Sequence, residues 1–410
     1  MGNSAPQPDH TEMRATSALD GLRIIDAATA LAAPAAATML ADFGADVIKV
    51  ELPGVGDMTR AHGTVHDGVP LFWAVLARNK RCITLDLRSP EGQDIFLDLA
   101  ATADVVIENY RPGTFEKWNL SPARLRERNP GLIIARLSGF GQTGPYRSRV
   151  AFGTIGEAMS GFAFRNGHPD GPPTLPPFGL ADCVAGMITS NAILTALWAR
   201  SKGAPGQDID VALVEALLHV LTPQEVEYGA TGVQLERQGN RSANNAPRNL
   251  YESRDGHWIA ISASGAATAA RVMELVERPD LAKEPWFEAA RGRVEHADEV
   301  DGAVATWVRA HDRRTVLQRA DELGIPMGPV YSTQDIFEDP HFSARDSITT
   351  VTSEDGAQLR MPNVAFRLSA TPGEIRWSGP VTLGAHNTEV YHELGLDDTD
   401  IERLRTNGVI

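Results

Sequence analysis

Between residues 22 and 138, short apolar runs alternate with longer amphipathic segments. Five runs have the apolar, β-branched content of buried strands: 22–27 (LRIIDA), 46–51 (DVIKVE), 82–87 (CITLDL), 104–109 (DVVIEN) and 132–137 (LIIARL). Helices are predicted over 34–43, which has a proline in its first turn, and over 89–102, which opens with Ser-Pro-Glu. This alternation predicts an α/β fold in which helices cover the faces of a parallel sheet.

Beyond the Gly-Pro-Pro sequence at 171–173, the pattern becomes mainly helical. Long helices are predicted over 181–200 and 211–228, and a polar, turn-rich stretch at 238–249 indicates a boundary. A strand at 257–262 and a series of amphipathic helices follow, before short strands return at 348–368. The last predicted helix covers 387–406.

Composition narrows the classes of function. The 410 residues include 53 acidic and 38 basic side chains, for a net charge of −15, which argues against a general binder of nucleic acid or anionic membranes. An anionic small ligand needs only a local basic cluster. The two cysteines form neither a disulfide framework nor a CxxC motif, as expected in a reducing compartment. Residues 1–17 lack the apolar core of a signal peptide, so we expect a disordered tail and a cytoplasmic protein.

Several motifs that suggest chemistry have simpler interpretations. The literal GxGxxG at 139–144 follows a strand, but Pro145 and a charged run replace the helix that a dinucleotide site requires, which favours a glycine-rich turn. Ser138 is not in a GxSxG elbow, and Cys183 is better explained as a small buried side chain. His62 and His66 are four residues apart without a third ligand, so no metal site is expected.

Asp182 is a more informative candidate. It lies where a turn gives way to the predicted helix 181–200, and the positive end of that helix would keep its carboxylate ionised and able to attack an activated acyl group. An aspartate that merely caps the helix is the alternative, which composition alone favours. Basic residues near the predicted strand ends could form an anion site or a solvated rim: Arg60, Lys80, Arg81, Arg88, Arg111 and Lys117.

A series of short motifs resembles one known family, the class III coenzyme A transferases, which include formyl-CoA transferase and carnitine CoA-transferase. The matching segments, in order, are 19–23 (LDGLR), 41–51 (ADFGADVIKVE), 78–81 (RNKR), 85–92 (LDLRSPEG), 108–113 (ENYRPG), 138–146 (SGFGQTGPY), 158–161 (AMSG), 170–173 (DGPP) and 181–182 (AD). The resemblance extends from about residue 19 to the C-terminus. It identifies 139–144 as the glycine-rich turn of that family.

The resemblance implies a set of site residues. The family's nucleophile falls on Asp182, which would carry CoA as a covalent aspartyl thioester between a donor acyl-CoA and an acceptor carboxylic acid. No cofactor is implied, since the CoA thioester is a substrate. The implied CoA contacts are Leu31, Ala32, Arg88, Asn109, Arg111, Lys117 and Phe152. Leu52 departs from the family pattern, because relatives often have an arginine there near the adenosine phosphate.

Two further departures bear on the reaction. The related acyl-CoA racemases have a histidine after the glycine-rich turn, but 150–154 (VAFGT) has no ionisable side chain, which argues against a racemase or epimerase. The glycine run of the formyl-CoA branch is missing from the small domain, where 240–249 is expected to line the acceptor site instead. We expect a dicarboxylic donor such as succinyl-CoA. A non-catalytic CoA-binding subunit that needs a paralogous partner is the main alternative.

The resemblance also implies an architecture. A Rossmann-like large domain would take residues 18–230 and 331–410, and a small α/β domain would take 231–330. Family members form interlocked dimers, so we expect a homodimer with active sites at the subunit interface.

Overall fold

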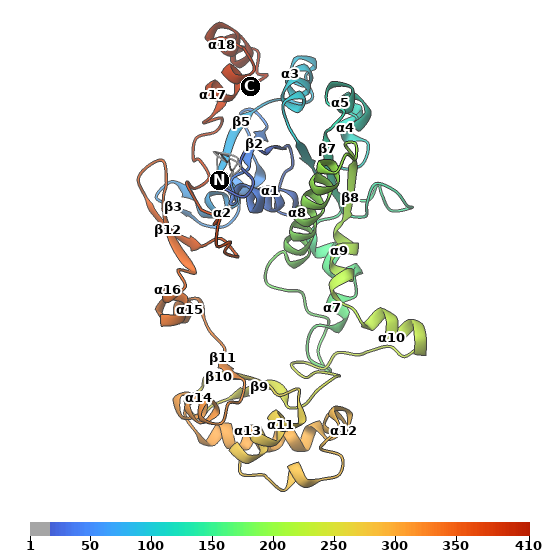
Figure 1. Cartoon of the computed structure of the whole chain (residues 1–410), viewed down its shortest axis with the longest axis vertical. Helices are drawn as coiled ribbons and strands as arrows, with labels where there is room; N and C mark the ends of the chain where they lie inside the picture. The colour runs from blue at the N-terminus through green and yellow to red at the C-terminus, as the bar shows by residue number, and fades with distance from the viewer. Residues whose placement is uncertain (1–16) are drawn as a thin grey trace, which may run out of the picture. The chain divides into compact units, whose positions relative to one another are not determined.

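The computed structural model describes residues 17–410, which divide into two compact units (Figure 1). Unit 1 consists of the described residues up to Ser160, together with Pro176–Val220 and Ala344–Ile410. Unit 2 consists of Gly161–Leu175 and Leu221–Ser343. The predicted small domain, 231–330, lies inside unit 2, which extends further at both ends. The predicted tail lies, apart from Ser17, outside the described residues.

Unit 1 is built on a six-stranded sheet with the order β5-β2-β1-β6-β7-β8, in which every neighbouring pair is parallel. The strands are β1 (Arg23–Asp26), β2 (Asp46–Glu51), β5 (Lys80–Thr84), β6 (Val105–Glu108), β7 (Ile133–Ser138) and β8 (Asp208–Ala212). The strand order reverses between β1 and β6, the place where open α/β sheets form a crevice at their carboxyl ends. The predicted α/β class and parallel sheet are confirmed.

Helices cover both faces of this sheet. The helices of unit 1 are α1 (Ala32–Ala41), α2 (Leu71–Leu76), α3 (Pro90–Ala101), α4 (Thr114–Lys117), α5 (Pro122–Arg128), α6 (Gly153–Met159), α8 (Leu180–Ser201), α9 (Leu213–Val220), α17 (Asn387–Glu393) and α18 (Asp398–Thr406), with a short 3-10 helix at Met58–Ala61. Ile25 and Ile48 pack with α3, α5 and the C-terminal helices. The alternate residues Ile24 and Val47 are also fully buried, while α1 and α8 pack together and contact the strands.

Two predicted helices differ from the structure: 387–406 is divided into α17 and α18, and 211–228 departs further. Residues 208–212 form the edge strand β8, and the remainder of the predicted helix 211–228 is divided into α9 and α10 (Gln224–Thr231), with Pro223 between them. Only Val211 and Ala212 of β8 are buried, so its apolar signal is too short to stand out in the sequence. Proline lacks the N–H that a continuous helix would need at this point.

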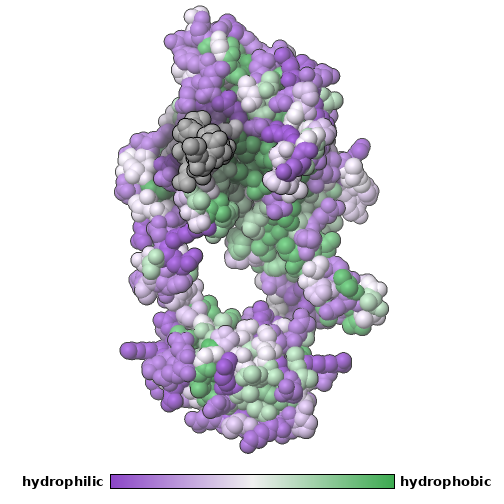
Figure 2. All heavy atoms as spheres, in the orientation of Figure 1, coloured by the Kyte–Doolittle hydropathy of each residue, from purple (hydrophilic) through white to green (hydrophobic). Residues whose placement is uncertain are grey.

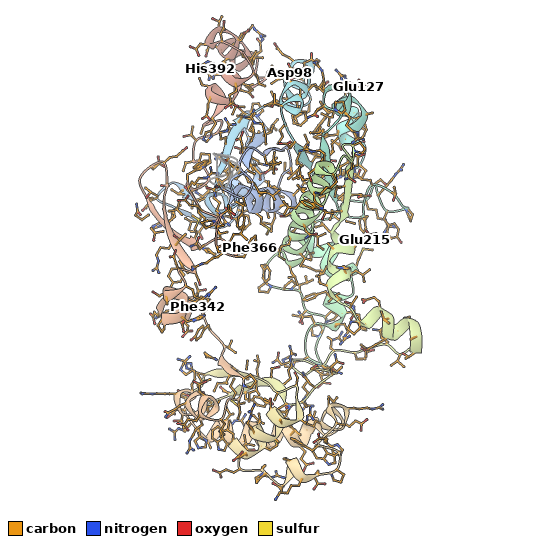
Figure 3. All side chains as sticks on the ribbon, in the orientation of Figure 1. Asp98, Glu127, Glu215, Phe342, Phe366 and His392 are labelled. Atoms are coloured by element: carbon orange, nitrogen blue, oxygen red, sulfur yellow. The ribbon has the colours of Figure 1, made fainter. Side chains whose placement is uncertain are left out.

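The C-terminal segment completes unit 1 at the β5 edge. The backbone N–H of Cys82 donates to His386 Nδ1 at 3.0 Å, and that of Thr84 donates to Asn387 Oδ1 at 2.8 Å. Tyr391 Oη donates to the Thr84 carbonyl at 2.5 Å. These side chains pair two backbone donors and one backbone acceptor that an open edge strand would leave unpaired. Figure 3 shows Phe366 on this returning segment, where it stacks on Phe43 at 4.3 Å between ring centroids.

Two small hairpins also belong to unit 1: β3 (Val65–His66) with β4 (Val69–Pro70), and β12 (Ile348–Thr352) with β13 (Gln358–Pro362). Unit 2 has its own core around an antiparallel sheet of β9 (Arg248–Glu252), β10 (Trp258–Ser262) and β11 (Met327–Pro329). Its helices are α7 (Phe162–Arg165), α10, α11 (Ala266–Leu275), α12 (Ala290–Glu295), α13 (Ala297–Ala310), α14 (Arg313–Glu322) and α15 (Thr333–Glu338), with a 3-10 helix at Leu281–Lys283. Helix α16 (Pro340–Ala344) ends at the boundary between the units.

Candidate active site

The turn that joins β1 to α1 is fixed by an amide side chain from the neighbouring strand. Asn109 follows β6 directly, and its Nδ2 donates to the Thr29 carbonyl at 2.6 Å while its Oδ1 accepts the Thr29 N–H at 2.8 Å. Between this clamp and α1, Ala30 has a φ of 62°, a left-handed conformation that is rare for alanine. Asn109 therefore shapes the turn that presents Leu31 and Ala32, and both ends of its amide are occupied in doing so.

A buried ion network lies beneath this turn. Lys80 Nζ contacts Asp26 Oδ2 at 2.8 Å and donates to the Pro34 carbonyl at 2.7 Å. Lys49 Nζ lies 3.0 Å from Asp57 Oδ2 and donates to the carbonyl of Ala28. Burial opposes the charge on Lys49, but Asp26 and Asp57 raise its pKa overall. The contacts of both lysines are therefore used to hold the start of α1 and the turn before it.

Carboxylates also neutralise most of the other basic residues of the expected rim. Arg60 pairs with Glu51 at 2.6 Å, and Arg81 pairs with Asp46 at 2.7 Å and with Glu389 and Glu393. Arg88 pairs with its neighbour Asp86 at 2.7 Å. These cations were expected to form a rim because they lie near strand ends. The carboxylates that neutralise them lie elsewhere along the chain or, for Arg88, two residues away.

Asp182 lies in the first turn of α8, and glycines surround its carboxyl group. A Cβ atom added at Gly153 would lie 2.1 Å from Asp182 Oδ2, and one added at Gly179 would lie 2.8 Å from the same oxygen. The backbone N–H of Gly153 donates to the carboxylate. Only residues without a side chain allow the backbone to come this close. The sequence placed Asp182 at the helix start, but the close approach of Gly153 depends on the fold.

A second carboxyl group, Glu157 on α6, shares the N-terminus of α8. Glu157 is 2% exposed, and its Oε1 accepts the backbone N–H of Ala181 at 3.3 Å. Glu157 therefore takes one of the donors that the helix start offers. Glu157 was not predicted, because an isolated glutamate 25 residues before Asp182 gives no signal in the sequence that the two side chains lie close together.

The pKa of Asp182 is raised to about 6, first by burial and second by the negative charge of Glu157, while the Gly153 N–H opposes the rise. The positive end of the helix was expected to determine the ionisation of Asp182, but burial and Glu157 have the larger effect on its pKa. The carboxylate remains mostly ionised at pH 7, because its pKa still lies about one unit lower. A half-desolvated anion of this kind is a stronger nucleophile than a fully solvated carboxylate.

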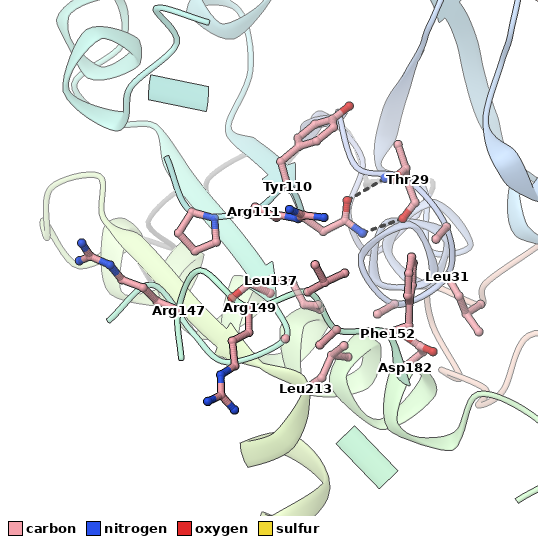
Figure 4. Close-up of a pocket in the computed structure, with 18 residues that line it drawn as sticks. Thr29, Leu31, Tyr110, Arg111, Leu137, Arg147, Arg149, Phe152, Asp182 and Leu213 are labelled. Atoms are coloured by element: carbon pink, nitrogen blue, oxygen red, sulfur yellow. Dashed lines mark hydrogen bonds between the residues drawn. The ribbon is translucent and has the colours of Figure 1, made fainter. Parts of the chain in front are cut away.

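Asp182 lines a cavity of about 230 Å³ at the carboxyl ends of β1, β6 and β7 (Figure 4). Six of the predicted site residues line it: Leu31, Ala32, Asn109, Arg111, Phe152 and Asp182. Figure 4 shows Phe152 and Leu31 beside Asp182, so apolar side chains flank the carboxylate. Among the described residues that form the cavity, Asp182 is the only carboxylate. Arg88 and Lys117 do not line it, and Leu52 lies outside it as well.

Two arginines of the cavity were not predicted. Arg147 and Arg149 follow the glycine-rich turn and line the cavity together with Arg111 (Figure 4). Arg149 also lies 3.6 Å from the centroid of the Tyr146 ring. Within residues 17–410, none of these three arginines forms an ion pair with a carboxylate. The charged run at 146–149 was visible in the sequence, but only the fold brings it to the cavity at the carboxyl end of β6. The same part of the chain contains no group of three or more His, Cys, Asp or Glu side chains arranged for a metal ion.

Comparison with known proteins agrees with this geometry. The chain matches the family described as CoA-transferase family III over residues 19–387. It is 42% identical to succinyl-CoA–D-citramalate CoA-transferase of Chloroflexus aurantiacus, over 96% of this chain and 98% of the relative. The beta subunit of succinyl-CoA–L-malate CoA-transferase from that organism is 41% identical, over 96% and 98% of the two chains.

A solved structure shows the same fold. The crystal structure of a CaiB/BaiF family protein from Brucella suis superposes with a TM-score of 0.80 and 32% identity, and the match covers 92% of this chain and 99% of that one. The resemblance inferred from the motifs is therefore confirmed: the chain belongs to CoA-transferase family III and is a CoA-transferase.

Proposed function

We propose that Asp182 carries CoA during the transfer. A carboxylate oxygen of Asp182 attacks the thioester carbonyl carbon of the donor, the C–S bond breaks, and a mixed anhydride and CoA thiolate form. The thiolate sulfur then attacks the aspartyl carbonyl carbon, which releases the donor acid as a carboxylate and leaves an aspartyl-CoA thioester. The acceptor carboxylate passes through the same two steps in reverse and restores free Asp182.

The placement of the Asp182 carboxylate carries this proposal. It is the one acidic group among the described cavity-lining residues, and it lies at the switch point of the sheet. Its pKa of about 6 leaves it ionised for attack at neutral pH. The flanking Leu31 and Phe152 would limit water around the anhydride and thioester, which hydrolysis would otherwise consume.

The arginines define how CoA would lie. A cavity of about 230 Å³ accommodates the acyl and thioester end rather than the whole of CoA. Arg111, Arg147 and Arg149 have no carboxylate partner in the described chain, so they are available for charge-assisted hydrogen bonds to the phosphates. Asn109 would act through the turn that it clamps. We propose no additional cofactor, because the thioester supplies the activation that the transfer needs.

We further propose dicarboxylic acids as substrates. The two Chloroflexus relatives are named for succinyl-CoA as donor and for citramalate or malate as acceptor. All three acids have a second carboxyl group that does not take part in the transfer. A donor such as succinyl-CoA is the corresponding choice for this chain.

An exposed apolar strip on α8 supports a homodimer. Met187, Leu194 and Trp198 are 50%, 41% and 66% exposed, although the helix also packs against α1 and the sheet. Figure 2 shows hydrophobic residues gathered over α8 and α9 on this face of unit 1. By length and composition alone α8 could cross a membrane, but such helices also occur in the cores of soluble proteins. We propose that a second copy of the chain covers the strip.

Mass spectrometry after incubation with succinyl-CoA tests the covalent step. The wild-type protein should gain a CoA adduct that peptide mapping places on Asp182, and hydroxylamine should convert it to a hydroxamate. Asp182→Asn should form no adduct and transfer no CoA. Transfer by that variant at the wild-type rate would refute the proposal. A purified chain that binds CoA but forms an adduct only when a paralogous chain is added would instead be a subunit of a hetero-oligomer.

A further inference from the structure

Unit 2 contains a polar cavity of its own. It has a volume of about 330 Å³ and is formed by the end of α7, the start of α10 and the loop that leads to β9. All of its lining residues belong to unit 2, so it is separate from the Asp182 cavity of unit 1. Residues 240–249, which were expected to line an acceptor site, form part of one wall.

Two arginines of this cavity lack a carboxylate partner. Arg165 Nη1 donates to Gln224 Oε1 at 3.2 Å, and its Nε is buried without a hydrogen-bond partner in the described part of the chain. Arg248 Nη1 donates to the backbone carbonyls of Asn240 at 2.8 Å and Arg241 at 3.2 Å. Neither guanidinium forms an ion pair with any residue that the structure describes. Both positive charges therefore remain available to an anion.

A third arginine shows the contrast. Arg241 also lines the cavity, but its Nε and Nη1 each lie 2.7 Å from a carboxylate oxygen, of Asp301 and Asp298 respectively. Its charge is neutralised by unit 2 itself. The structure thus neutralises one arginine of the wall and leaves two without a counter-ion, an arrangement that a ligand with two negative charges would complete.

An amide of the same wall needs a hydrogen-bond donor. Asn245 Nδ2 donates to Ser264 Oγ at 2.5 Å, but Asn245 Oδ1 is buried without a partner among the described residues. A carboxylate cannot satisfy this oxygen, because both groups are acceptors. A hydroxyl group on the ligand would satisfy it. A buried acceptor that is left unpaired costs free energy, so the site should discriminate in favour of a ligand that supplies the hydroxyl.

We propose that this cavity binds a short hydroxydicarboxylate, with its carboxylates on Arg165 and Arg248 and its hydroxyl on Asn245 Oδ1. The class of ligand follows from the charges and the unpaired acceptor of this cavity, and its binding does not depend on the proposed function. Glu227 is the carboxylate of the lining and would repel such a dianion. Variants of the arginines and of Glu227 should therefore change affinity in opposite directions.

Isothermal titration of the full-length Asp182→Asn protein tests binding without turnover. L-malate should bind more tightly than succinate, which lacks the hydroxyl, and butyrate should bind more weakly still. Arg165→Gln and Arg248→Gln should each weaken malate binding by about tenfold or more, the effect of losing one charge-assisted hydrogen bond. Glu227→Gln should tighten it. Arg291→Gln is the matched control, because that side chain is 90% exposed and, among residues 17–410, pairs only with Glu295.

Selectivity gives an independent measurement. Asn245→Leu should reduce the preference for malate over succinate, and a melting curve checks that this variant is folded. Malate binding by both arginine variants that equals that of the Arg291→Gln control would overturn the proposal, as would the absence of malate binding to the parent protein.

The rate of adduct formation, measured in proteins that retain Asp182, separates this site from the covalent mechanism. Arg165→Gln should weaken malate binding and leave formation of the CoA adduct from succinyl-CoA unchanged. Failure of the adduct to form in the wild-type protein would refute the Asp182 mechanism without affecting the titrations.

Discussion

Gly153 offers the sharpest test of the Asp182 geometry. It is the first residue of α6 and its φ lies outside the left-handed region, so alanine is compatible with its backbone. The added Cβ, however, would lie 2.1 Å from Asp182 Oδ2, whereas real Cβ atoms essentially never come within 3.0 Å of another heavy atom. The carboxylate must therefore move by about 0.9 Å (3.0 minus 2.1) or the start of α6 must shift.

A movement of this size should be costly for catalysis and inexpensive for folding. A misplacement of about 1 Å can lower a rate by about 10²-fold, which corresponds to about 2.7 kcal/mol in the barrier. Alanine is at the same time favoured over glycine in helices by up to about 1 kcal/mol, which offsets part of the strain. We therefore expect Gly153→Ala to form the CoA adduct about 100-fold more slowly, with little change in melting temperature.

The assay is quenched-flow mass spectrometry of adduct formation from succinyl-CoA, combined with titration of CoA. Gly302→Ala is the matched control, because Gly302 lies within α13 and a Cβ there meets nothing within 4 Å. That variant should react at the wild-type rate. If Gly153→Ala formed the adduct at the wild-type rate, the carboxylate position described above would not be the reactive one. Loss of CoA affinity in proportion to the rate would show that the glycine acts on binding rather than on the nucleophile.

Three other outcomes follow from the charges around the site. Burial raises the pKa of Asp182 from its usual 3.8 to about 6, so ionisation of this group lowers the free energy of unfolding as pH rises through that window. Between pH 4 and 7, Asp182→Asn should therefore gain up to about 3 kcal/mol in free energy of unfolding relative to wild type, as measured by denaturant unfolding at each pH. Adduct formation by the wild-type protein should fall as pH drops through about 6, and Glu157→Gln should move that limb to lower pH, because its charge contributes to the raised pKa; an unmoved limb would contradict this. Arg149→Gln should raise KM for succinyl-CoA about tenfold without a similar change in kcat, whereas Arg88→Gln, whose guanidinium already pairs with Asp86, should change it little; equal effects would place the phosphates elsewhere.

The sequence was sufficient for the sheet because its central strands are continuous apolar runs. Strands β1, β2, β5, β6 and β7 all overlap the predicted segments, whereas β8 has Asp208 and Asp210 on its exposed positions and escaped detection. Asp182 was a candidate from its position at a helix start, but only the family resemblance favoured it as the nucleophile over a helix cap. Its immediate surroundings were not predicted, because Gly153 and Glu157 approach it only through the packing of α6 on α8.

Charged residues near strand ends were the least predictable part of the site. Lys80 and Arg81 looked like candidates for an anion site, but Asp26 and Asp46 neutralise them from positions distant in the sequence. Arg147 and Arg149, by contrast, line the cavity although nothing in the sequence pattern predicted them there. Whether a cation is free depends on which carboxylates the fold brings to it, and a single sequence does not contain that information.

The closure of the β5 edge by His386, Asn387 and Tyr391 has a consequence for synthesis on the ribosome. After Val220 has been added, 190 more residues (410 minus 220) must be translated before unit 1 has all of its parts. At about 5–20 residues per second this takes about 10–40 s, during which the apolar face that α17 and α18 will cover is open in the nascent chain. Leu221–Ser343 emerges within that interval, and together with Gly161–Leu175, which is already translated, it can fold as unit 2 first. Yield from expression should therefore depend on chaperones that shield the unfinished sheet, and a stop codon before residue 386 should produce aggregates rather than a smaller active enzyme.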